Sequence, residues 1–551
     1  MKAKGLVFVC CSLILIFASC GSSDGTVEEY GETGTLTISF GSQTGGTRLA
    51  VTPTEQESIV HQIILTSPGR PTQTRTHTGV EGSVSFTNLA NGVVWTVTIW
   101  GWSTSLPAVT GYSAAFSLNS DGRFLRGWGQ SAVTLSATNA NPTVLVTMIP
   151  ATQVSSDSQL GLAVTNARTD GETIIILMGN FPVSSTQNIT AGQNISLVAN
   201  AAGAGLFRAL TTPIFNIDDV GRLQLGREGF NAPFTISGLG AADGTTPFPG
   251  VITSALIRVH IGTLVMYDGV TISGNHNENT TDVNQPNTHG GGGVRVSGGT
   301  NSFFEMHGGF IQGNRTAQRG GGVALESGNF TMIGGTISYN VADLNGGGVA
   351  QNGGAFNMSG GTISHNEANN TTSTAVPRGG GGVWYVNGLS FTMSGGTIGP
   401  YNTAAEDGGG IAVSTGDNGN VSISGGRIID NAAAQDGGGI YFNTGSAQTD
   451  ATISGVIISD NTANRSGGGI WLGGLTTVEI TGGSITGNEA TVALGGGIYM
   501  ENQNTAILEI ADKDIVSGNT TNLGGPQEVN GGVNAIVWID GVEQFDNDRW
   551  W

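Results

Sequence analysis

The chain has 551 residues, of which 92 are glycine and only 11% are charged, and its net charge is −20 at pH 7. This length exceeds what one compact core needs, and the apolar content is too high for a disordered chain, so two or more domains are expected. The excess of acidic residues argues against nucleic acid as a partner, because phosphate binding requires Lys and Arg to displace condensed counterions.

Residues 1–19 have the pattern of a secretory signal peptide, in which a basic start precedes an apolar run from Leu6 to Phe17 that is too short to span a bilayer. The residues around Cys20 resemble the cleavage site of bacterial lipoproteins, where small residues precede a cysteine that becomes lipidated. The resemblance implies that acyl chains on Cys20 anchor the protein to the outer membrane or cell surface, with residues 20–34 as a flexible tether. Ordinary secretion is the alternative. The other two cysteines lie inside the signal, so neither a disulfide nor a cysteine-ligated metal is expected in one mature chain.

Residues 35–150 consist of short runs in which apolar and polar residues alternate, separated by turn residues. This spacing predicts an antiparallel β-sandwich of roughly seven strands. Trp95, Trp100 and Trp102 crowd one of these strands, and a packing role is favoured over stacking on sugars. The pattern resembles the Ig-like or prealbumin-like modules that precede the main domain of bacterial surface lipoproteins.

A glycine-punctuated repeat fills residues 264–523. One unit runs from Gly346 to Asn366 and contains a glycine run followed by Val, a Phe-x-Met segment, and Thr-Ile-x-x-Asn. Such a unit is too short for a propeller blade and lacks the periodicity of a helix. Three short strands per turn, stacked at about 4.8 Å, predict a parallel β-helix in which equivalent residues of successive coils form columns. The Asn that closes each unit is expected to form an amide ladder, with rungs at Asn314, Asn340, Asn366, Asn431, Asn461 and Asn488.

The segments on either side of the repeats keep short apolar runs but lose the glycine motif. Because the terminal coils of a solenoid have one face without a neighbour, they are expected to be atypical. Residues 151–263 are therefore predicted to form irregular opening coils and a cap, and residues 524–551 a C-terminal cap.

Two short motifs recur through the repeats. One is Gly-Gly-Val-Ala, ending at Ala324 and Ala350, and the other is Ile-x-x-Asn, as from Ile337 to Asn340. They resemble the Gly-Gly-Ala-Ile and Phe-x-x-Asn hallmarks of polymorphic outer membrane proteins and related pectate-lyase-like β-helices. The resemblance implies an all-β chain, with a right-handed parallel β-helix after the N-terminal sandwich, and a surface-displayed protein used in adhesion.

Two carboxylate pairs are candidates for chemistry, because stacking places equivalent residues of adjacent coils about 5 Å apart. Asp407 and Asp436 each precede a glycine run, and Asp430 and Asp460 each precede a closing Asn. Paired carboxylates suit a retaining glycosidase or a cation site, but Asp is also common in turns, and the structural role is favoured for both pairs. No catalytic residue, metal ligand or cofactor is assigned. The alternative for a metal is an inserted loop with four possible ligands: His276, Glu278, Asp282 and His289.

A column of aromatic residues is the best candidate for a binding face. It is formed by the residue after the Val or Ile of the glycine run: Trp384, Tyr441, Trp471 and Tyr499. Strand alternation places this residue on the outer face, so the sequence predicts an exposed stripe for sugar rings or an apolar partner surface. Mutual stacking that protects the sheet is the structural alternative.

Two functions are compatible with these features. The favoured one is a monomeric, non-enzymatic lipoprotein that displays a rigid β-helix for adhesion or for binding a glycan or a host or partner surface. The other is a polysaccharide lyase or glycoside hydrolase acting on a carbohydrate bound along the β-helix, which rests on fold analogy alone. Nothing in the sequence marks a nucleophile–base arrangement, so the enzymatic question stays open, with a non-enzymatic role favoured.

Overall fold

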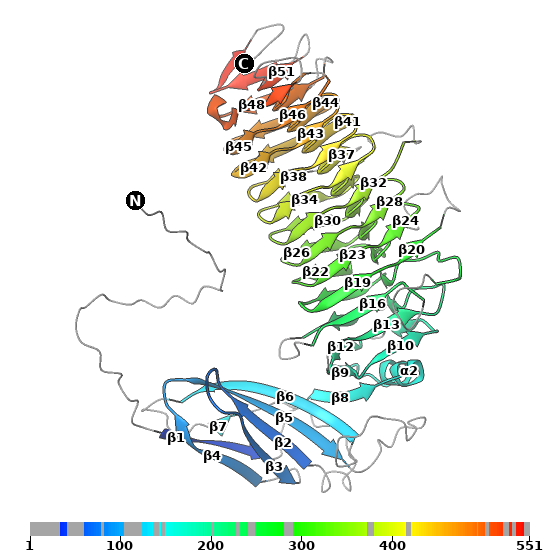
Figure 1. Cartoon of the computed structure of the whole chain (residues 1–551), viewed down its shortest axis with the longest axis vertical. Helices are drawn as coiled ribbons and strands as arrows, with labels where there is room; N and C mark the ends of the chain where they lie inside the picture. Colours follow the sequence, from blue (N-terminus) through cyan, green and yellow to red (C-terminus); the bar gives the residue numbers. More distant parts are fainter. Residues whose placement is uncertain are drawn as a thin grey trace, which may run out of the picture.

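The computed structural model describes most of the chain from Thr33 onward (Figure 1). The described residues are 33–40, 60–78, 82–103, 124–135, 143–144, 149–190, 192–200, 203–227, 232–240, 248–279, 290–371, 379–414, 420–492, 494–501, 506–521, 528–531 and 536–544. The predicted signal peptide and Cys20 lie outside them, as do Asp282 and His289 of the inserted loop.

The N-terminal strands form two sheets that share one apolar cluster. The strands are β1 (Thr33–Phe40), β2 (Val60–Thr66), β3 (Gln73–Thr78), β4 (Gly82–Ala90), β5 (Val94–Ser103), β6 (Phe124–Thr134), β7 (Thr143–Val144) and β8 (Ile149–Val154). One sheet has the order β4-β1-β7, and the other runs from β3 through β2, β5 and β6 to β8. Leu36 of the first sheet and Ile63 and Trp95 of the second are all buried in the cluster. Apolar residues of both sheets therefore meet in one buried cluster.

From β8 onward the strands stack in parallel, coil upon coil, in the arrangement of a parallel β-helix. The coils before Gly262 contribute in turn to three columns of strands and the coils of the glycine-rich repeat to four, which we call the first to fourth stacks. The first stack comprises β11 (Gln187–Ile189), β14 (Phe215–Ile217), β17 (Ile257–Val259), β21 (Val294–Val296), β25 (Val323–Leu325), β29 (Val349–Gln351), β33 (Val383–Val386), β37 (Ile411–Ser414), the start of β41 (Ile440–Ile453) and of β44 (Ile470–Ile480), β47 (Ile498–Met500) and β51 (Val529–Gly531). The second stack comprises β9 (Glu172–Leu177), β12 (Asn194–Ala199), β15 (Gly221–Leu225), β18 (Gly262–Met266), β22 (Ser302–Met306), β26 (Asn329–Met332), β30 (Ala355–Met358), β34 (Ser390–Met393), β38 (Asn420–Ile423), the ends of β41 and β44, β48 (Ile507–Ile510) and β52 (Ile536–Ile539).

The third and fourth stacks complete each coil. The third stack comprises β10 (Asn180–Val183), β13 (Ala204–Arg208), β16 (Phe234–Ser237), β19 (Val270–Ser273), β23 (Phe310–Gln312), β27 (Thr336–Ser338), β31 (Thr362–Ser364), β35 (Thr397–Ile398), β39 (Arg427–Ile429), β42 (Val456–Ser459), β45 (Gly483–Thr486) and β49 (Val516–Ser517). The fourth stack comprises β20 (His276–Asn277), β24 (Arg315–Thr316), β28 (Val341–Ala342), β32 (Glu367–Ala368), β36 (Thr403–Ala404), β40 (Ala432–Ala433), β43 (Thr462–Ala463), β46 (Glu489–Ala490) and β50 (Thr520–Thr521). The repeat therefore has one more strand per coil than the sequence predicts, because the residues just after the closing Asn pair as well.

Elements that do not belong to the stacks lie near both ends of the β-helix. Helix α2 (Asp157–Thr165) covers the first coils, and its Leu160 and Val164 belong to the same buried cluster as the coil interior. At the other end, a short 3-10 helix η1 (Lys513–Ile515) precedes the last coils, and β53 (Val542–Gln544) turns back antiparallel to β52. The coils before residue 264 lack the glycine run but already stack in register, as β15 does on β12.

Strand β8 joins the N-terminal sheets to the β-helix. It pairs antiparallel with β6 and parallel with β9, the first strand of the second stack. The junction buries Trp128, Ala151 and Ile174, with Trp100 and Trp102 packed against them. The predicted packing role is confirmed for Trp100 and Trp102 here and for Trp95 in the apolar cluster of the two sheets. Backbone hydrogen bonding passes without interruption from one region to the next.

The interior of the β-helix is built from columns of identical side chains. Phe304, Phe330 and Phe356 stack with ring centroids 4.7 and 4.8 Å apart and nearly parallel planes, and Phe391 continues the column at 5.4 Å. Met306 and Met332 are equally buried on adjacent rungs. Each fully buried side chain of this size contributes about 1.5–3 kcal/mol, so any slip in register would lose many favourable contacts at once.

The predicted amide ladder is present, and it includes further rungs at Asn402 and Asn519. The Nδ2 of each Asn donates to the Oδ1 of the Asn in the next coil at 2.9–3.1 Å, from Asn314 through Asn402 to Asn519. Nδ2 also donates to a carbonyl of the preceding coil, as Asn340 does to Ile311 at 2.9 Å. The last rung ends on a buried carboxylate, since Asn519 Nδ2 donates to Glu528 Oε2 at 2.7 Å.

Glycine is required beside this ladder because no side chain fits there. A Cβ on Gly322 would lie 2.8 Å from the carbonyl oxygen of Gly348 and 3.0 Å from Asn340 Nδ2. Gly346, two residues before the equivalent position in the next coil, has a φ of +69°, which disfavours other residues. The amide ladder therefore requires the glycine runs beside it.

Replacing a central rung is expected to destabilise the coils around it. In Asn366→Ala, the backbone N–H of Asn340 loses the Asn366 side chain as its acceptor, Asn340 Nδ2 loses one of its two acceptors, and the carbonyl of Ile337 loses a donor, all in a buried site. We expect the free energy of unfolding to fall by at least about 2 kcal/mol, measured by calorimetry and by hydrogen exchange of the neighbouring coils. Asn357→Ala, on the outer side of the same coil, is the control; equal effects of the two changes would contradict a structural role for the ladder.

Candidate functional site

The predicted outer aromatic column exists in the predicted register. Trp384 pairs with Ala412, which pairs with Tyr441, and Trp471 and Tyr499 follow on the next rungs. The rings of Tyr441 and Trp471 stack at 4.4 Å with planes 15° apart.

The prediction that this column is an exposed stripe is wrong. Trp384 is 2% exposed and Tyr441 and Trp471 are each 5% exposed, while only Tyr499 is half-buried. The large side chains lie against small neighbours. Trp384 packs between Ala350 and Ala412, its neighbours in the same outer column. The guanidinium of Arg319 lies over the Trp384 ring, 4.5 Å from the ring centroid.

Trp471 is buried for a similar reason. A Cβ on Gly473 would come within 2.3 Å of the Trp471 ring, so the indole lies directly on the backbone of that glycine. Strand alternation identified the correct side of the sheet. Strand alternation does not show whether small neighbouring residues let an aromatic side chain lie flat on the sheet. The structural alternative, in which the side chains stack on one another and cover the sheet, describes this column.

The first carboxylate pair satisfies backbone groups. Asp407 Oδ1 accepts from the N–H of Asp436 at 3.2 Å, and Asp436 Oδ1 accepts from the N–H of Ser466 at 3.0 Å. Burial raises the pKa of Asp436, opposed by the charge of Arg465, whose Nη1 lies 3.4 Å from Asp436 Oδ2. Each carboxylate thus binds the turn of the following coil, which is the structural role favoured for an Asp at this position.

The same region contains a buried phenol surrounded by acidic groups. Burial is the main cause that raises the pKa of Tyr441, and the charges of Asp407, Asp436 and Glu501 raise it further, against a hydrogen bond from Asn443. A phenol in an unfolded chain ionises near pH 10. The folded protein therefore keeps this proton at pH values where the unfolded chain has released it.

Alkaline pH is consequently expected to destabilise the protein partly through Tyr441. The stability contribution of the neutral phenol is complete below about pH 10 and is lost as pH rises towards the higher folded-state pKa. In Tyr441→Phe, the decrease of Tm with pH above this point should be shallower than in the wild type. Trp471→Phe changes the same stack without removing a phenol and should keep the wild-type slope; an unchanged slope in Tyr441→Phe would contradict the assignment.

The second carboxylate pair belongs to a different feature, at the corner between the third and fourth stacks. The residue before the closing Asn has positive φ in coil after coil, and it is glycine near both ends, as at Gly313 and Gly487. In the five coils between them it is not glycine, with φ from 52° to 62°, at Tyr339, His365, Tyr401, Asp430 and Asp460. We call these five residues the corner ladder.

The backbone of the corner ladder would be less strained with glycine throughout. A left-handed conformation costs about 1–2 kcal/mol for most residues with a Cβ, which applies to Tyr339 and Tyr401, whereas Asp and His adopt it more readily. Such strain at a surface position points to a use for the side chains, since the backbone geometry alone gains nothing from them.

The aromatic part of the corner ladder is stacked, and its two tyrosines are exposed while His365 is half-buried. The rings of Tyr339 and His365 lie 4.5 Å apart with planes at 28°, and His365 meets Tyr401 edge-on at 5.1 Å. Tyr339 is 59% exposed and Tyr401 is 62% exposed. An exposed aromatic column on the rung spacing therefore exists, at another place than predicted.

Polar groups border these rings. Two residues after each ladder position, the fourth stack places Val341, Glu367 and Thr403 on successive rungs, and the last two are exposed. Further along the corner, Asp430 and Asp460 are exposed in adjacent coils. Aromatic faces next to carboxylates and hydroxyls match the apolar faces and hydroxyl edges of sugar rings.

Sequence reasoning singled out Asp430 and Asp460 but missed the three aromatic members. The available signal was positional: each lies immediately before a closing Asn, in the same place as the two aspartates. That position does not follow strand alternation, because the chain bends there, and so the period-two argument did not reach it.

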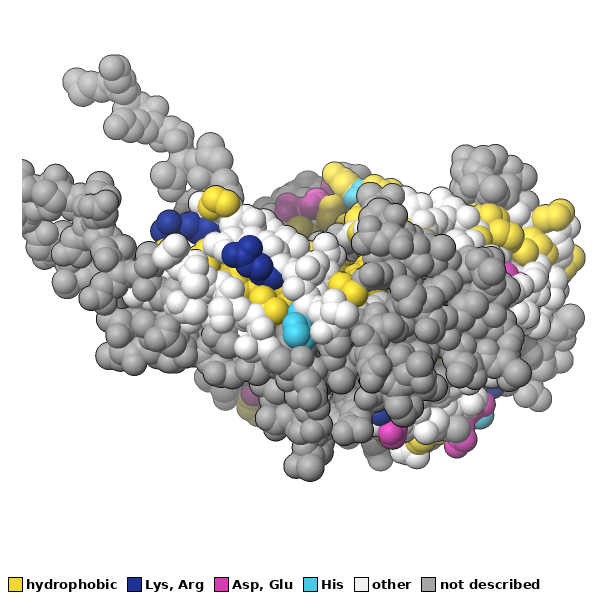
Figure 2. Space-filling model, turned by 90° about the horizontal axis from the view of Figure 1, so that it is seen from below, with side chains coloured by type: hydrophobic (Ala, Val, Ile, Leu, Met, Phe, Trp, Pro, Cys, Tyr) yellow, Lys and Arg dark blue, Asp and Glu magenta, His cyan; other side chains and the backbone are white. Residues whose placement is uncertain are grey.

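The described part of the chain also bears on the metal-site and membrane-span predictions. There, no group of three or more His, Cys, Asp or Glu side chains is placed to hold a metal ion, and His276 and Glu278 lie 3.6 Å apart as an isolated pair. No described helix is long and apolar enough to cross a bilayer. Seen from below in Figure 2, the coloured surface at the N-terminal end is mostly uncharged, with its charged side chains scattered.

Comparison with known proteins gives no relative to guide the assignment. No protein-family model matches the chain, and the comparisons with curated proteins and with solved structures found no match.

Proposed function

We propose that this protein is a non-enzymatic surface protein that binds glycan through the corner ladder. The observation that carries the proposal is the stack of the exposed Tyr339 and Tyr401 with the half-buried His365 between them, held at positive φ by a rigid coil. Fixed aromatic rings lose little conformational freedom on binding, which favours recognition of a flexible polymer.

The chemistry of the surroundings supports a sugar over a purely apolar partner. The exposed rings are narrow, one per coil, and hydroxyl and carboxylate groups such as Thr403 and Glu367 lie beside them. A glycan chain lying along the column would place successive rings over successive aromatic side chains. An apolar protein surface would instead leave these polar groups desolvated without partners.

Removing aromatic rungs is expected to weaken glycan binding. Tyr339→Ala and Tyr401→Ala should each reduce affinity about 2- to 10-fold, the value of one stacked aromatic contact. The measurement is a glycan array with the unlipidated protein, followed by calorimetric titration of the best ligand. Both tyrosines are exposed, so Tm should change little.

Phe310→Ala is the matched control, because Phe310 is 45% exposed on the outer side of the third stack and outside the corner ladder. Unchanged affinity in both tyrosine variants, or an equal loss in the control, would rule out the corner ladder as the binding site. Release of unsaturated or reducing ends from the bound glycan with turnover would replace the binding role by catalysis, as a polysaccharide lyase or hydrolase.

The wider proposal is that the protein is displayed on the outer membrane or cell surface through a lipidated Cys20. It rests on the signal-like N-terminus and on the likeness of the repeats to those of polymorphic outer membrane proteins, which also implies right-handed coils. The Ig-like or prealbumin-like N-terminal module belongs to the same proposal. The same proposal has the protein bind its ligand as a monomer and without a cofactor.

Cys20→Ala is expected to abolish lipidation and release the protein from the membrane fraction. Metabolic labelling with a clickable palmitate analogue measures lipid attachment, and fractionation measures its location. The control is Cys11→Ala, inside the predicted signal, which should remain labelled. Labelling of the Cys20 variant would contradict the anchor.

A further inference from the structure

The outer face of the first stack carries a pair of arginines on adjacent rungs, several coils before the corner ladder. Arg258 of β17 pairs in register with Arg295 of β21. Like charges on neighbouring rungs are unfavourable unless a negative group lies beside them.

Only one of the two arginines has its own bonded carboxylate. Arg295 Nη2 donates to Glu326 Oε2 at 2.7 Å. Glu326 lies one coil further on, at the residue that follows Leu325 as Ser297 follows Val296 and His260 follows Val259. The ion pair therefore joins Arg295 to the next coil, two residues beyond Ala324, its partner in register.

The same diagonal step from Arg258 leads to Ser297, which has no carboxylate. The Nε atoms of Arg258 and Arg295 are both buried without a hydrogen-bond partner, so the difference between the two arginines lies in the carboxylate; beside Arg258, the Oγ of Ser297 is also buried and unpartnered, in a residue that is only 7% exposed. The site thus lacks the one group that its neighbour has in Glu326.

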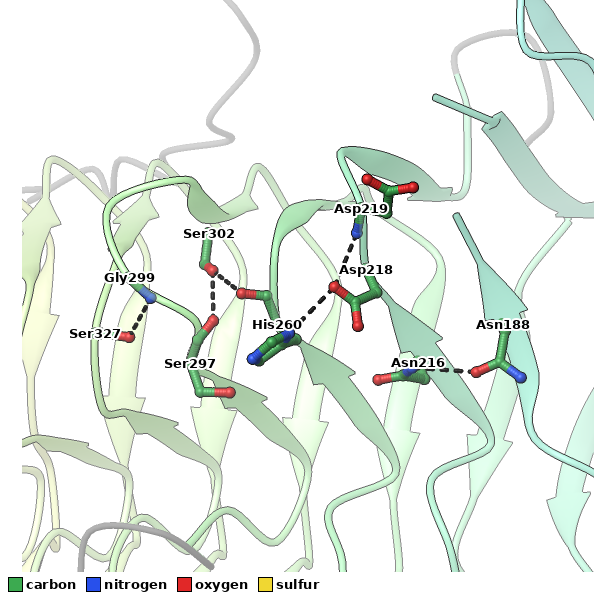
Figure 3. A network of polar contacts seen from close by, with 9 residues as sticks. All are labelled: Asn188, Asn216, Asp218, Asp219, His260, Ser297, Gly299, Ser302 and Ser327. Atoms are coloured by element: carbon green, nitrogen blue, oxygen red, sulfur yellow. Dashed lines mark hydrogen bonds and ion pairs between the residues drawn. The ribbon is translucent and has the colours of Figure 1, made fainter. Parts of the chain in front are cut away.

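The other carboxylate nearby is already engaged. Asp218 Oδ1 lies 3.1 Å from His260 Nδ1 and accepts from the N–H of Asp219 at 2.8 Å (Figure 3). Asp218 acts on Arg258 through its charge, as Glu326 does, and the nearby Arg295 acts against both. Figure 3 also shows His260 between Asp218 and Ser297 at the ends of neighbouring strands, with Ser302 held by the carbonyls of His260 and Ser297.

We infer that Arg258 and the Oγ of Ser297 bind a carboxylate carried by an acidic sugar. The ligand carboxylate would take the place relative to Arg258 that Glu326 takes relative to Arg295, accepting from the guanidinium and from the serine hydroxyl. A net charge of −20 repels dense polyanions, so the fitting ligand is a glycan with isolated uronate residues. That the ligand is a sugar rests on the proposed function, whereas the preference for a carboxylate rests on this second site alone.

The test compares a glucuronate-containing oligosaccharide with the same oligosaccharide reduced at its carboxyl groups, by calorimetric titration of the full chain. The wild type is expected to bind the acidic form at least about tenfold more tightly, the value of a charge-assisted hydrogen-bonded pair. In Arg258→Gln this preference should disappear while affinity for the reduced form is unchanged. Ser297→Asp, which supplies an internal carboxylate, should also remove the preference.

Two controls separate this site from the corner ladder. Arg427→Gln, which changes an exposed arginine on the third stack, should keep the preference, and Tyr401→Ala should weaken both oligosaccharides without changing their ratio. Equal binding of the two forms to the wild type, absence of binding by both, or a preference that survives Arg258→Gln would overturn the inference. Free glucuronate that binds as tightly as the oligosaccharide would overturn the assignment to a glycan.

Discussion

The structure depends on register between coils, and the register is fixed where a buried amide meets a glycine. Each closing Asn bonds to the coils before and after it, and the glycine of the adjacent run leaves room for that amide. A shift of one residue would turn every interior side chain outward and leave the amides without partners in an apolar interior. The aromatic and methionine columns add contact energy, but the amides select a single alignment.

Register also explains why two aromatic columns of the same molecule behave differently. On the first stack, Trp384 and Trp471 have alanine or glycine beside them and lie flat on the sheet. At the corner, Tyr339 and Tyr401 leave the backbone with positive φ, where the chain bends and no neighbour on the same strand can cover them. One column thus becomes a second layer over the sheet, while the other stays available to a ligand.

Much of the fold follows from the sequence, because residues of fixed spacing occupy equivalent places in every coil. The Phe and Met columns, the amide ladder and the order of the outer aromatic residues all follow from counting along the repeat. Three features did not: the short fourth strand, the burial of Trp384 and the corner ladder. The first consists of two-residue strands with no periodicity to detect. The second and third depend on the size of neighbouring residues and on local φ, which a pattern of apolar alternation does not contain.

The end of the amide ladder has a consequence for how the molecule meets copies of itself. Every rung passes a donor forward, so a ladder that stopped at Asn519 would offer its N–H groups to the first coil of another molecule. Glu528 accepts those hydrogen bonds, and its other oxygen accepts from the N–H of Gly518. An ionised carboxylate accepts hydrogen bonds but has no proton to donate to a further coil. Strand β53 is also antiparallel to β52, the last strand of the second stack. The amide ladder therefore offers no free donor at its C-terminal end, which removes one route to head-to-tail stacking of a parallel solenoid.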